Sequence, residues 1–394
     1  MRPGTIVILA LVVILLGDVA LRALLHREAA TGASQAPPAD VFGYHTAREF
    51  VIVRDDVVVA RVPGAFGRQV WTGSGNTAVL LSLAPAADER WHELTYVDSR
   101  TGISGRIPCE SCVDIVAHGP DSVVVLVVRT RRNGTVGEAM ERGLSQLWRF
   151  RFGGPEPIGT VYPGNRTGGP ELVAATSTHV LSAGRDLDAI RLEREIPVPK
   201  TAWDDRPLEA TTLSSYDDTP YASSVAADPG ADRLLLAPRT VHPPYCGAAD
   251  PIEVLTDSLE HRRIYPPAAA TAKTGTGVHD LWWSADGGFH ATVATWPCRE
   301  MVGRVTWKAQ VSLASWRLEP ETGQWFADGP TSATMTRSLP SGIRLLLEIP
   351  SCTSEPRFQR EYSNCVDGTL YAERRGVRTT IADEVEYVST PALR

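Results

Sequence analysis

Short apolar segments alternate with polar turns along most of the sequence. The clearest example begins at His279, where two apolar segments flank the turn Ser284-Ala-Asp-Gly-Gly288. It ends in a hairpin of mixed polar and apolar residues between Val311 and Trp325. Gly, Asp, Asn and Pro occupy the turns, as tight reversals of the backbone require. The pattern predicts a unit of four short strands in which a longer connection joins the second strand to the third.

The same unit recurs six times from about residue 69 onward. The copies span 70–107, 113–161, 172–198, 223–264, 279–325 and 335–381. A repeat of roughly 40 to 50 residues with four short strands is typical of a β-propeller. We therefore predict an all-β propeller in which each copy forms one blade.

Two segments outside the six copies complement each other. Phe50 to Val62 predicts a hairpin like the outer half of a blade, and Glu384 to Thr390 predicts an innermost strand. Pairing of the two would close the ring and remove the exposed edges of an open array. This favours seven four-stranded blades closed by the N- and C-terminal strands. Six blades are the alternative if the third copy is irregular.

The N-terminus carries an uninterrupted apolar run. Ile6 to Gly17 is purely apolar, and counting through Leu25 gives about the 20 residues that a membrane span needs. A cleaved signal peptide is the alternative, because the uninterrupted run is short. Both interpretations place the rest of the chain outside the cytoplasm. We divide the sequence into a signal anchor or signal peptide (1–27), a flexible linker (28–41) and a β-propeller domain (42–394).

The cysteines agree with an exported protein. Their number is six, and an even count beside an export signal predicts disulfides in an oxidising compartment. The expected pairs are Cys109 with Cys112, Cys246 with Cys298, and Cys352 with Cys365.

Two runs of residues resemble a known family. Trp-Ser-Ala-Asp-Gly-Gly at 283–288 and Tyr-Val-Asp-Ser-Arg-Thr-Gly at 96–102 resemble the repeats of TolB-like and WD40-like bacterial propellers. As a pattern, the similarity extends over most of 42–390. The resemblance implies a scaffold or binding module and no particular activity, since one fold hosts many functions.

The loops predict a binding face. In a four-stranded blade, the second-to-third loops and the links between blades lie on one face, and here this set is long. Long loops in a compact domain are often functional, and aromatic residues interleaved with charged ones suit glycan or protein recognition. The predicted ligand-binding residues are Trp203, Tyr245, Trp296, Trp307, Arg239 and Arg299. For each aromatic residue the alternative is a role in the core, as for Trp296 capping the end of a blade.

Other chemistry is less well supported. Cys109-Glu-Ser-Cys112 has redox spacing, but no thioredoxin-like pattern surrounds it, which favours a structural disulfide. We expect no metal and no cofactor, since no second Cys or His pair lies at ligand spacing. A propeller enzyme would need polar groups from several inner strands around the central channel. Asp114, Asp280 and Glu386 are the acids expected there.

The sequence therefore predicts a membrane-tethered, extracytoplasmic and monomeric propeller without catalytic activity. It would bind an envelope protein or glycan on its long-loop face, and a secreted form is the alternative. A net charge of −7 argues against nucleic-acid binding, which needs a basic stripe. The other candidate function is a propeller hydrolase or lyase that acts on a glycan or lactone at the central channel.

Overall fold

Every regular element that the structure describes is a β-strand. Chain contacts separate Met1–Pro38 from a larger unit, Ala39–Arg394, which contains all of the described residues. The computed structural model describes residues 39–72, 75–82, 93–109, 112–128, 145–152, 154, 157–166, 171–183, 186–192, 195–197, 208–215, 222–228, 233–238, 251–256, 258–267, 274–284, 287–297, 312–349 and 368–391.

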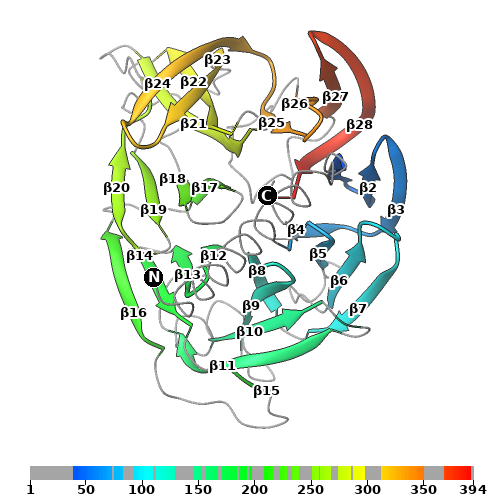
Figure 1. Ribbon diagram of the computed structural model, residues 1–394, viewed down its shortest axis with the longest axis vertical. Helices are drawn as coiled ribbons and strands as arrows, with labels where there is room; N and C mark the ends of the chain where they lie inside the picture. The colour runs from blue at the N-terminus through cyan, green and yellow to red at the C-terminus, as the bar shows by residue number, and fades with distance from the viewer. Residues whose placement is uncertain are drawn as a thin grey trace, which may run out of the picture. The chain divides into compact units, whose positions relative to one another are not determined.

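The strands form six hydrogen-bonded sheets with antiparallel neighbours (Figure 1). Three sheets have four consecutive strands: β4 (Phe66–Trp71), β5 (Thr77–Ser82), β6 (Glu93–Asp98) and β7 (Ser104–Pro108); β17 (Ala222–Ala227), β18 (Arg233–Pro238), β19 (Ile252–Thr256) and β20 (His261–Ile264); and β21 (Thr274–Trp283), β22 (Phe289–Pro297), β23 (Ser312–Glu319) and β24 (Gln324–Thr331). These sheets correspond to the first, fourth and fifth predicted copies.

In the next two sheets, one short strand pairs with the neighbouring sheet and not with the strands beside it in the sequence. One contains β8 (Cys112–His118), β9 (Ser122–Val128), β10 (Ser145–Arg151), β11 (Ile158–Arg166) and, outermost, β15 (Ile196–Pro197). The other contains β12 (Glu171–Ala175), β13 (His179–Ala183), β14 (Asp186–Arg191) and β16 (Ala210–Ser215). The predicted third copy, 172–198, is therefore wrong beyond β14. Its last residues join the preceding sheet, and its fourth strand is β16.

The seven-stranded sheet contains both ends of the larger unit. Its order is β25 (Met335–Ser338), β26 (Arg344–Glu348), β27 (Gly368–Arg374), β28 (Val377–Ser389), β1 (Val41–Thr46), β2 (Glu49–Arg54) and β3 (Val57–Pro63). The first part of β28 pairs with β27, and its last residues pair with β1, from Val385 opposite Thr46 to Ser389 opposite Gly43. Between the two parts, Glu384 has a φ of 57°, which a non-glycine residue adopts only where the chain bends sharply. The predicted closure by terminal strands is confirmed, with β1 inserted between the two predicted segments.

Neighbouring sheets pack face to face. The middle strands are apolar on both sides, as in β9, where all seven residues are buried. In β5, Ala78 and Leu80 pack toward β2, whereas Val79 and Leu81 pack toward β8 and β9. Burial of each Val or Leu side chain contributes about 1.5–3 kcal/mol. The stability of each sheet therefore depends on the sheets before and after it.

The innermost strands follow one another in a circuit. β4 lies beside β8, then β12, β17, β21, β25 and β28 follow, each in contact with the one before. Trp71 Nε1 of β4 donates a hydrogen bond of 2.9 Å to Ser389 Oγ of β28, and this contact closes the circuit. Figure 1 shows the sheets radiating from the centre of this unit, which is the arrangement of a β-propeller.

Candidate functional site

The predicted ligand-binding residues lie mostly outside the described residues. This applies to Trp203, Tyr245, Trp307, Arg239 and Arg299, and also to Cys246, Cys298, Cys352 and Cys365. Trp296 is described. It lies in β22 with only 3% of its surface exposed, and its indole ring fills the space where a side chain at Gly275 would lie. In this structure Trp296 is a core residue, the second of the two alternatives, and its ring offers no area to a ligand.

The connections that carry most of these residues leave the sheets at one end. Segments 239–251 and 298–311 join the second strand of a sheet to the third, as do 83–92, 129–144 and 349–367. The inner strands run side by side around the circuit, so these connections start from equivalent strand ends. Segment 192–209, which carries Trp203, is an exception, because it contains β15 and joins the third strand, β14, to the fourth, β16. Trp203 therefore belongs to another class of connection than Tyr245 and Trp307.

Asp114 ties three innermost strands together. Its carboxylate is 1% exposed and forms an ion pair with Arg68 of β4. Its Oδ2 also accepts a 2.7 Å hydrogen bond from the backbone N–H of Leu172 in β12. Arg68 Nη1 also donates a 2.7 Å hydrogen bond to the backbone carbonyl of Leu172. A buried carboxylate with this set of partners is a structural brace between sheets.

Asp280 occupies the same place on the opposite side of the circuit. It is fully buried in β21. Its Oδ1 accepts from Ser224 Oγ of β17 at 3.3 Å, and its Oδ2 accepts from Arg337 Nη1 of β25 at 2.6 Å and from the Thr336 N–H at 3.1 Å. Burial would lower the pKa of Arg337, but its interactions with Asp280 and Tyr387 outweigh this and raise the pKa. Arg337 is therefore charged at all accessible pH values.

A one-residue register shift precedes these side chains in the inner strands. In β4, β8, β17 and β21 the shift falls immediately before Arg68, Asp114, Ser224 and Asp280, and in β12 it falls before Ala174. A β-bulge turns the following side chain away from the regular alternation, so these residues occupy equivalent positions. The sequence indicated the two acids but not Arg68 or Ser224, because alternation alone does not reveal a bulge. It also did not indicate Arg337, which lies in β25, where the pairing with β26 is regular.

The third acid expected at the channel, Glu386, lies on β28 and faces a histidine. Glu386 Oε2 lies 3.5 Å from His45 Nε2 of β1, and the His45 ring stacks on Tyr387. Asp114, Asp280 and Glu386 thus have separate sets of partners and do not converge on one histidine. Hydrolysis at the channel would require acids free to meet a substrate. The two inner-strand acids are instead engaged as braces.

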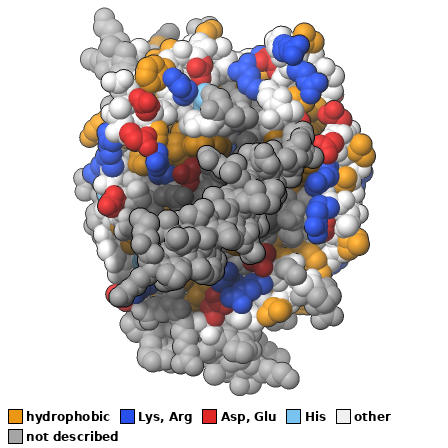
Figure 2. All heavy atoms as spheres, viewed as in Figure 1, with side chains coloured by type: hydrophobic (Ala, Val, Ile, Leu, Met, Phe, Trp, Pro, Cys, Tyr) orange, Lys and Arg blue, Asp and Glu red, His pale blue; other side chains and the backbone are white. Residues whose placement is uncertain are grey.

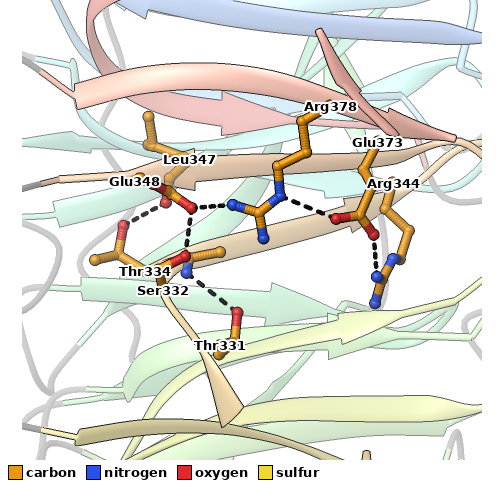
Figure 3. Close-up of polar contacts among 9 residues, drawn as sticks. Thr331, Ser332, Thr334, Arg344, Leu347, Glu348, Glu373 and Arg378 are labelled. Carbon is orange, nitrogen blue, oxygen red and sulfur yellow. Dashed lines mark hydrogen bonds and ion pairs between the residues drawn. The ribbon is translucent and has the colours of Figure 1, made fainter. Parts of the chain in front are cut away.

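The outer strands carry a second kind of polar network. Figure 3 shows Arg378 of β28 between Glu373 of β27 and Glu348 of β26, at 3.0 and 2.5 Å, and Arg344 on the other side of Glu373. Burial would raise the pKa of Glu373, but hydrogen bonds from Arg344 and Arg378 outweigh it and lower the pKa. This network joins three adjacent strands and stabilises the outer half of the sheet.

Glu195 explains why β15 joins a neighbouring sheet. Its two oxygens accept from Arg149, Arg151, Thr160 and Tyr162 of β10 and β11, at 2.5 to 3.1 Å. Burial raises the pKa of Tyr162 to about 12, and the charge of Glu195 adds to this effect. Glu195 therefore holds the chain just before β15 against the edge of this sheet.

His118 gives the protein a pH-dependent stability. Burial, together with the charge of Arg149, lowers the pKa of His118 from 6.5 to about 4. Between these values the unfolded chain binds a proton that the folded chain does not, so stability falls as the pH falls. We expect a loss of up to about 3 kcal/mol between pH 6.5 and pH 4. Urea unfolding across this range should show a shallower decline for His118→Gln, and equal slopes for both proteins would contradict the assignment.

The CxxC cysteines form a disulfide. Cys109 and Cys112 are bonded and buried where the chain passes from β7 to β8. Both pack among the apolar side chains of Val79, Leu81 and Ile115. The predicted Cys109–Cys112 pair is confirmed.

The structure describes few other features with a chemical role. Over the described ranges, no group of three or more His, Cys, Asp and Glu side chains is placed to hold a metal ion. The same residues include no helix that is long and apolar enough to cross a membrane. The predicted anchor, 1–27, lies outside them.

Comparisons with known proteins give similarity at the level of the fold. No protein-family model matches the sequence, and no curated protein matches it. Among solved structures, the chain is similar to the β-propeller domain of Cps50 (Swd1) from Myceliophteria thermophila, with 10% identity and a TM-score of 0.42 over 79% of this chain and 90% of that one.

Two further structures are similar at the same level. Hsv2 from Kluyvelomyces marxianus shares 10% identity, with a TM-score of 0.38 over 74% of this chain and 97% of that one. The β-propeller domain of the Trilobed protease from Pyrococcus furiosus, described as having an open velcro topology, shares 13% identity, with a TM-score of 0.40 over 85% and 90%. Identities this low transfer no function.

Proposed function

We propose that this chain is a membrane-tethered, extracytoplasmic propeller of seven blades that binds a protein or a cell-envelope glycan without catalysis. In this proposal β28 belongs to two blades. Its first part is the outer strand of the blade that contains β27, and its last residues are the innermost strand of the blade that contains β1. The binding face is the end of the sheets from which the long second-to-third connections leave. The N-terminal segment 1–27 is the tether, and the residues between it and Ala39 separate it from the propeller.

The difference between the inner strands and the long connections supports this proposal. The inner-strand acids Asp114 and Asp280 are buried and held by Arg68 and Arg337, so these two acids serve as structural contacts between inner strands. The long connections, in contrast, start from equivalent strand ends and carry aromatic and charged residues. A rigid scaffold that presents variable loops is the usual basis of a binding module.

Binding can be tested with the full chain purified in detergent. A glycan array and affinity capture from solubilised envelopes would each identify a ligand, and the ligand would then be titrated. We expect the double variant Tyr245→Ala/Trp307→Ala to weaken binding about a hundredfold, or roughly 2.7 kcal/mol, since aromatic residues dominate recognition.

The matched control is Phe326→Ala, which removes an aromatic ring of β24 that is 41% exposed and lies over Arg317. We expect this variant to bind as the unmodified chain does. Equal weakening by both variants would show that the long connections do not form the binding surface.

A further inference from the structure

Exposed aliphatic side chains recur at one position in four consecutive sets of strands. Val377, Val57, Ile103 and Ile158 are 69%, 62%, 68% and 60% exposed. Val377, Val57 and Ile158 are each the first residue of the fourth strand of their set, and Ile103 directly precedes Ser104, the first residue of the fourth strand β7. We call these four residues the aliphatic row. Figure 2 shows hydrophobic and basic side chains next to one another along the rim of this unit, over β28, β3 and β7.

Arginines accompany the aliphatic row. The cross-strand partners of Val57, Val377 and Ile158 are Arg54, Arg374 and Arg151. Cross-strand partners point to the same side of a sheet, so each aliphatic side chain has a guanidinium beside it. Ile103 follows a turn in which Arg100 bonds Asp98 at 3.1 Å. Aliphatic residues flanked by arginines are the composition of surfaces that sit at the boundary of lipid headgroups and acyl chains.

The geometry of the array suits a flat partner. Equivalent positions in sets of strands arranged around one axis lie at the same height along that axis. The aliphatic row therefore traces an arc in a plane perpendicular to the axis. A single protein partner would have to be curved or large to reach all four positions, whereas a bilayer meets them together.

The chain enters the larger unit on the same side. The backbone N–H of Asp55, in the turn just before Val57, donates to the Asp40 carbonyl at 2.9 Å, and the Asp40 N–H donates to Asp55 Oδ1 at 2.9 Å. Asp40 Oδ1 also accepts from the N–H of Ser341, in the turn between β25 and β26. Ala47 and Arg48 lie at the other end of β1, where it turns into β2, and both are exposed.

We propose that the aliphatic row and its arginines rest on the phospholipid surface to which the chain is tethered. This inference depends on the tether of the proposed function and adds an orientation to it. In that proposal the tether precedes Asp40 in the chain, and Asp40 is held beside the turn at Asp55 and the turn at Ser341, so the side that carries the aliphatic row would face the bilayer. The ends that carry the long connections would then face away from the membrane, toward a ligand in the aqueous phase.

Arg54 and Arg374 would donate to lipid phosphates while the aliphatic side chains enter the interface. Arg151 is held by Glu195 and Arg100 by Asp98, so these two arginines would contribute positive charge to the surface. Asp55 is 61% exposed beside Arg54, at 4.0 Å, and offsets part of the positive charge of this side. We therefore expect contact with any phospholipid phosphate, in neutral and anionic membranes alike.

The test compares the contact with lipid at two positions of the aliphatic row with the contact at Ala47, in the turn between β1 and β2. The full chain would be reconstituted into vesicles of phosphatidylcholine, alone or with phosphatidylglycerol, with the photo-crosslinker p-benzoylphenylalanine in place of Val57, Ile103 or, as the control, Ala47. All three positions are exposed, so the replacements should leave the unfolding temperature unchanged. After irradiation, lipid adducts would be counted by mass spectrometry on chains that float with the vesicles.

We expect the adduct yield at Val57 and Ile103 to exceed that at Ala47 by about tenfold in both membranes, because photo-crosslinking requires contact. Equal yields at the three positions, or a higher yield at Ala47, would overturn the orientation and leave the tether intact. Chains that do not float with the vesicles would disprove the tether, and the inference would fail with it. Ligand binding by the same reconstituted chain reports separately on the long connections.

Discussion

Replacing Asp280 by alanine is expected to lower the free energy of unfolding by about 3–5 kcal/mol, because it leaves Arg337 charged and without its buried carboxylate. The Thr336 N–H and Ser224 Oγ lose an acceptor in the same change. Strands β17, β21 and β25 of three neighbouring sheets meet at this one side chain, so the loss should lower the cooperativity of the whole unit. Urea unfolding followed by tryptophan fluorescence would measure the change.

Two further variants separate the brace from a general effect of substitution. Asp383→Ala removes an exposed acid whose Oδ1 accepts one 2.9 Å hydrogen bond from Thr369, and it should cost less than about 0.5 kcal/mol. The double variant Asp280→Ala/Arg337→Met removes both charges, and it should be more stable than Asp280→Ala alone. If Asp280→Ala costs less than about 1 kcal/mol, the brace does not stabilise the array.

The alternation of apolar segments was enough to locate most of the sheets. The predicted copy 113–161 overlaps each of β8 to β11, which run from 112 to 166, and the closing strand was expected at 384–390. Buried middle strands give a clear signal, as in β9, where every residue after Ser122 is apolar. The alternation did not place β1. Gly43 interrupts the apolar pattern of that strand, yet the structure requires glycine there, since a Cβ would lie 2.5 Å from the Phe50 ring.

Contacts between residues distant in sequence account for the other differences. The two residues of β15 carry no pattern of their own, and Glu195 directs them to a neighbouring sheet through Arg149 and Arg151. The inner-strand braces depend on bulges that bring Asp114 to Arg68, 46 residues away. Neither the bulge nor the partner is visible in a local pattern. The acids were thus recognised as unusual on inner strands, while their structural role became evident only from the partners.

Removing residues 385–394 is expected to abolish cooperative folding of the larger unit. The deletion takes away the part of β28 that pairs with β1, the buried side chains of Val385 and Val388, and the bond from Trp71 to Ser389. Burial of the two valines alone contributes about 3–6 kcal/mol, against a total of about 5–15 kcal/mol for a typical domain. The deletion would also leave the edge of β1 open to association with other chains.

Size-exclusion chromatography and thermal unfolding would test this expectation. We expect aggregated protein or a broad transition for the deletion, and the same result in milder form for Val388→Asp, which keeps the chain length and places a charge in the core. Deletion of residues 392–394 alone is the matched control and should leave the transition unchanged. If the chain without 385–394 unfolds in one transition within a few degrees of the intact protein, strand β28 does not hold the ring closed. The array would then be stable as an open set of sheets that stack on one another.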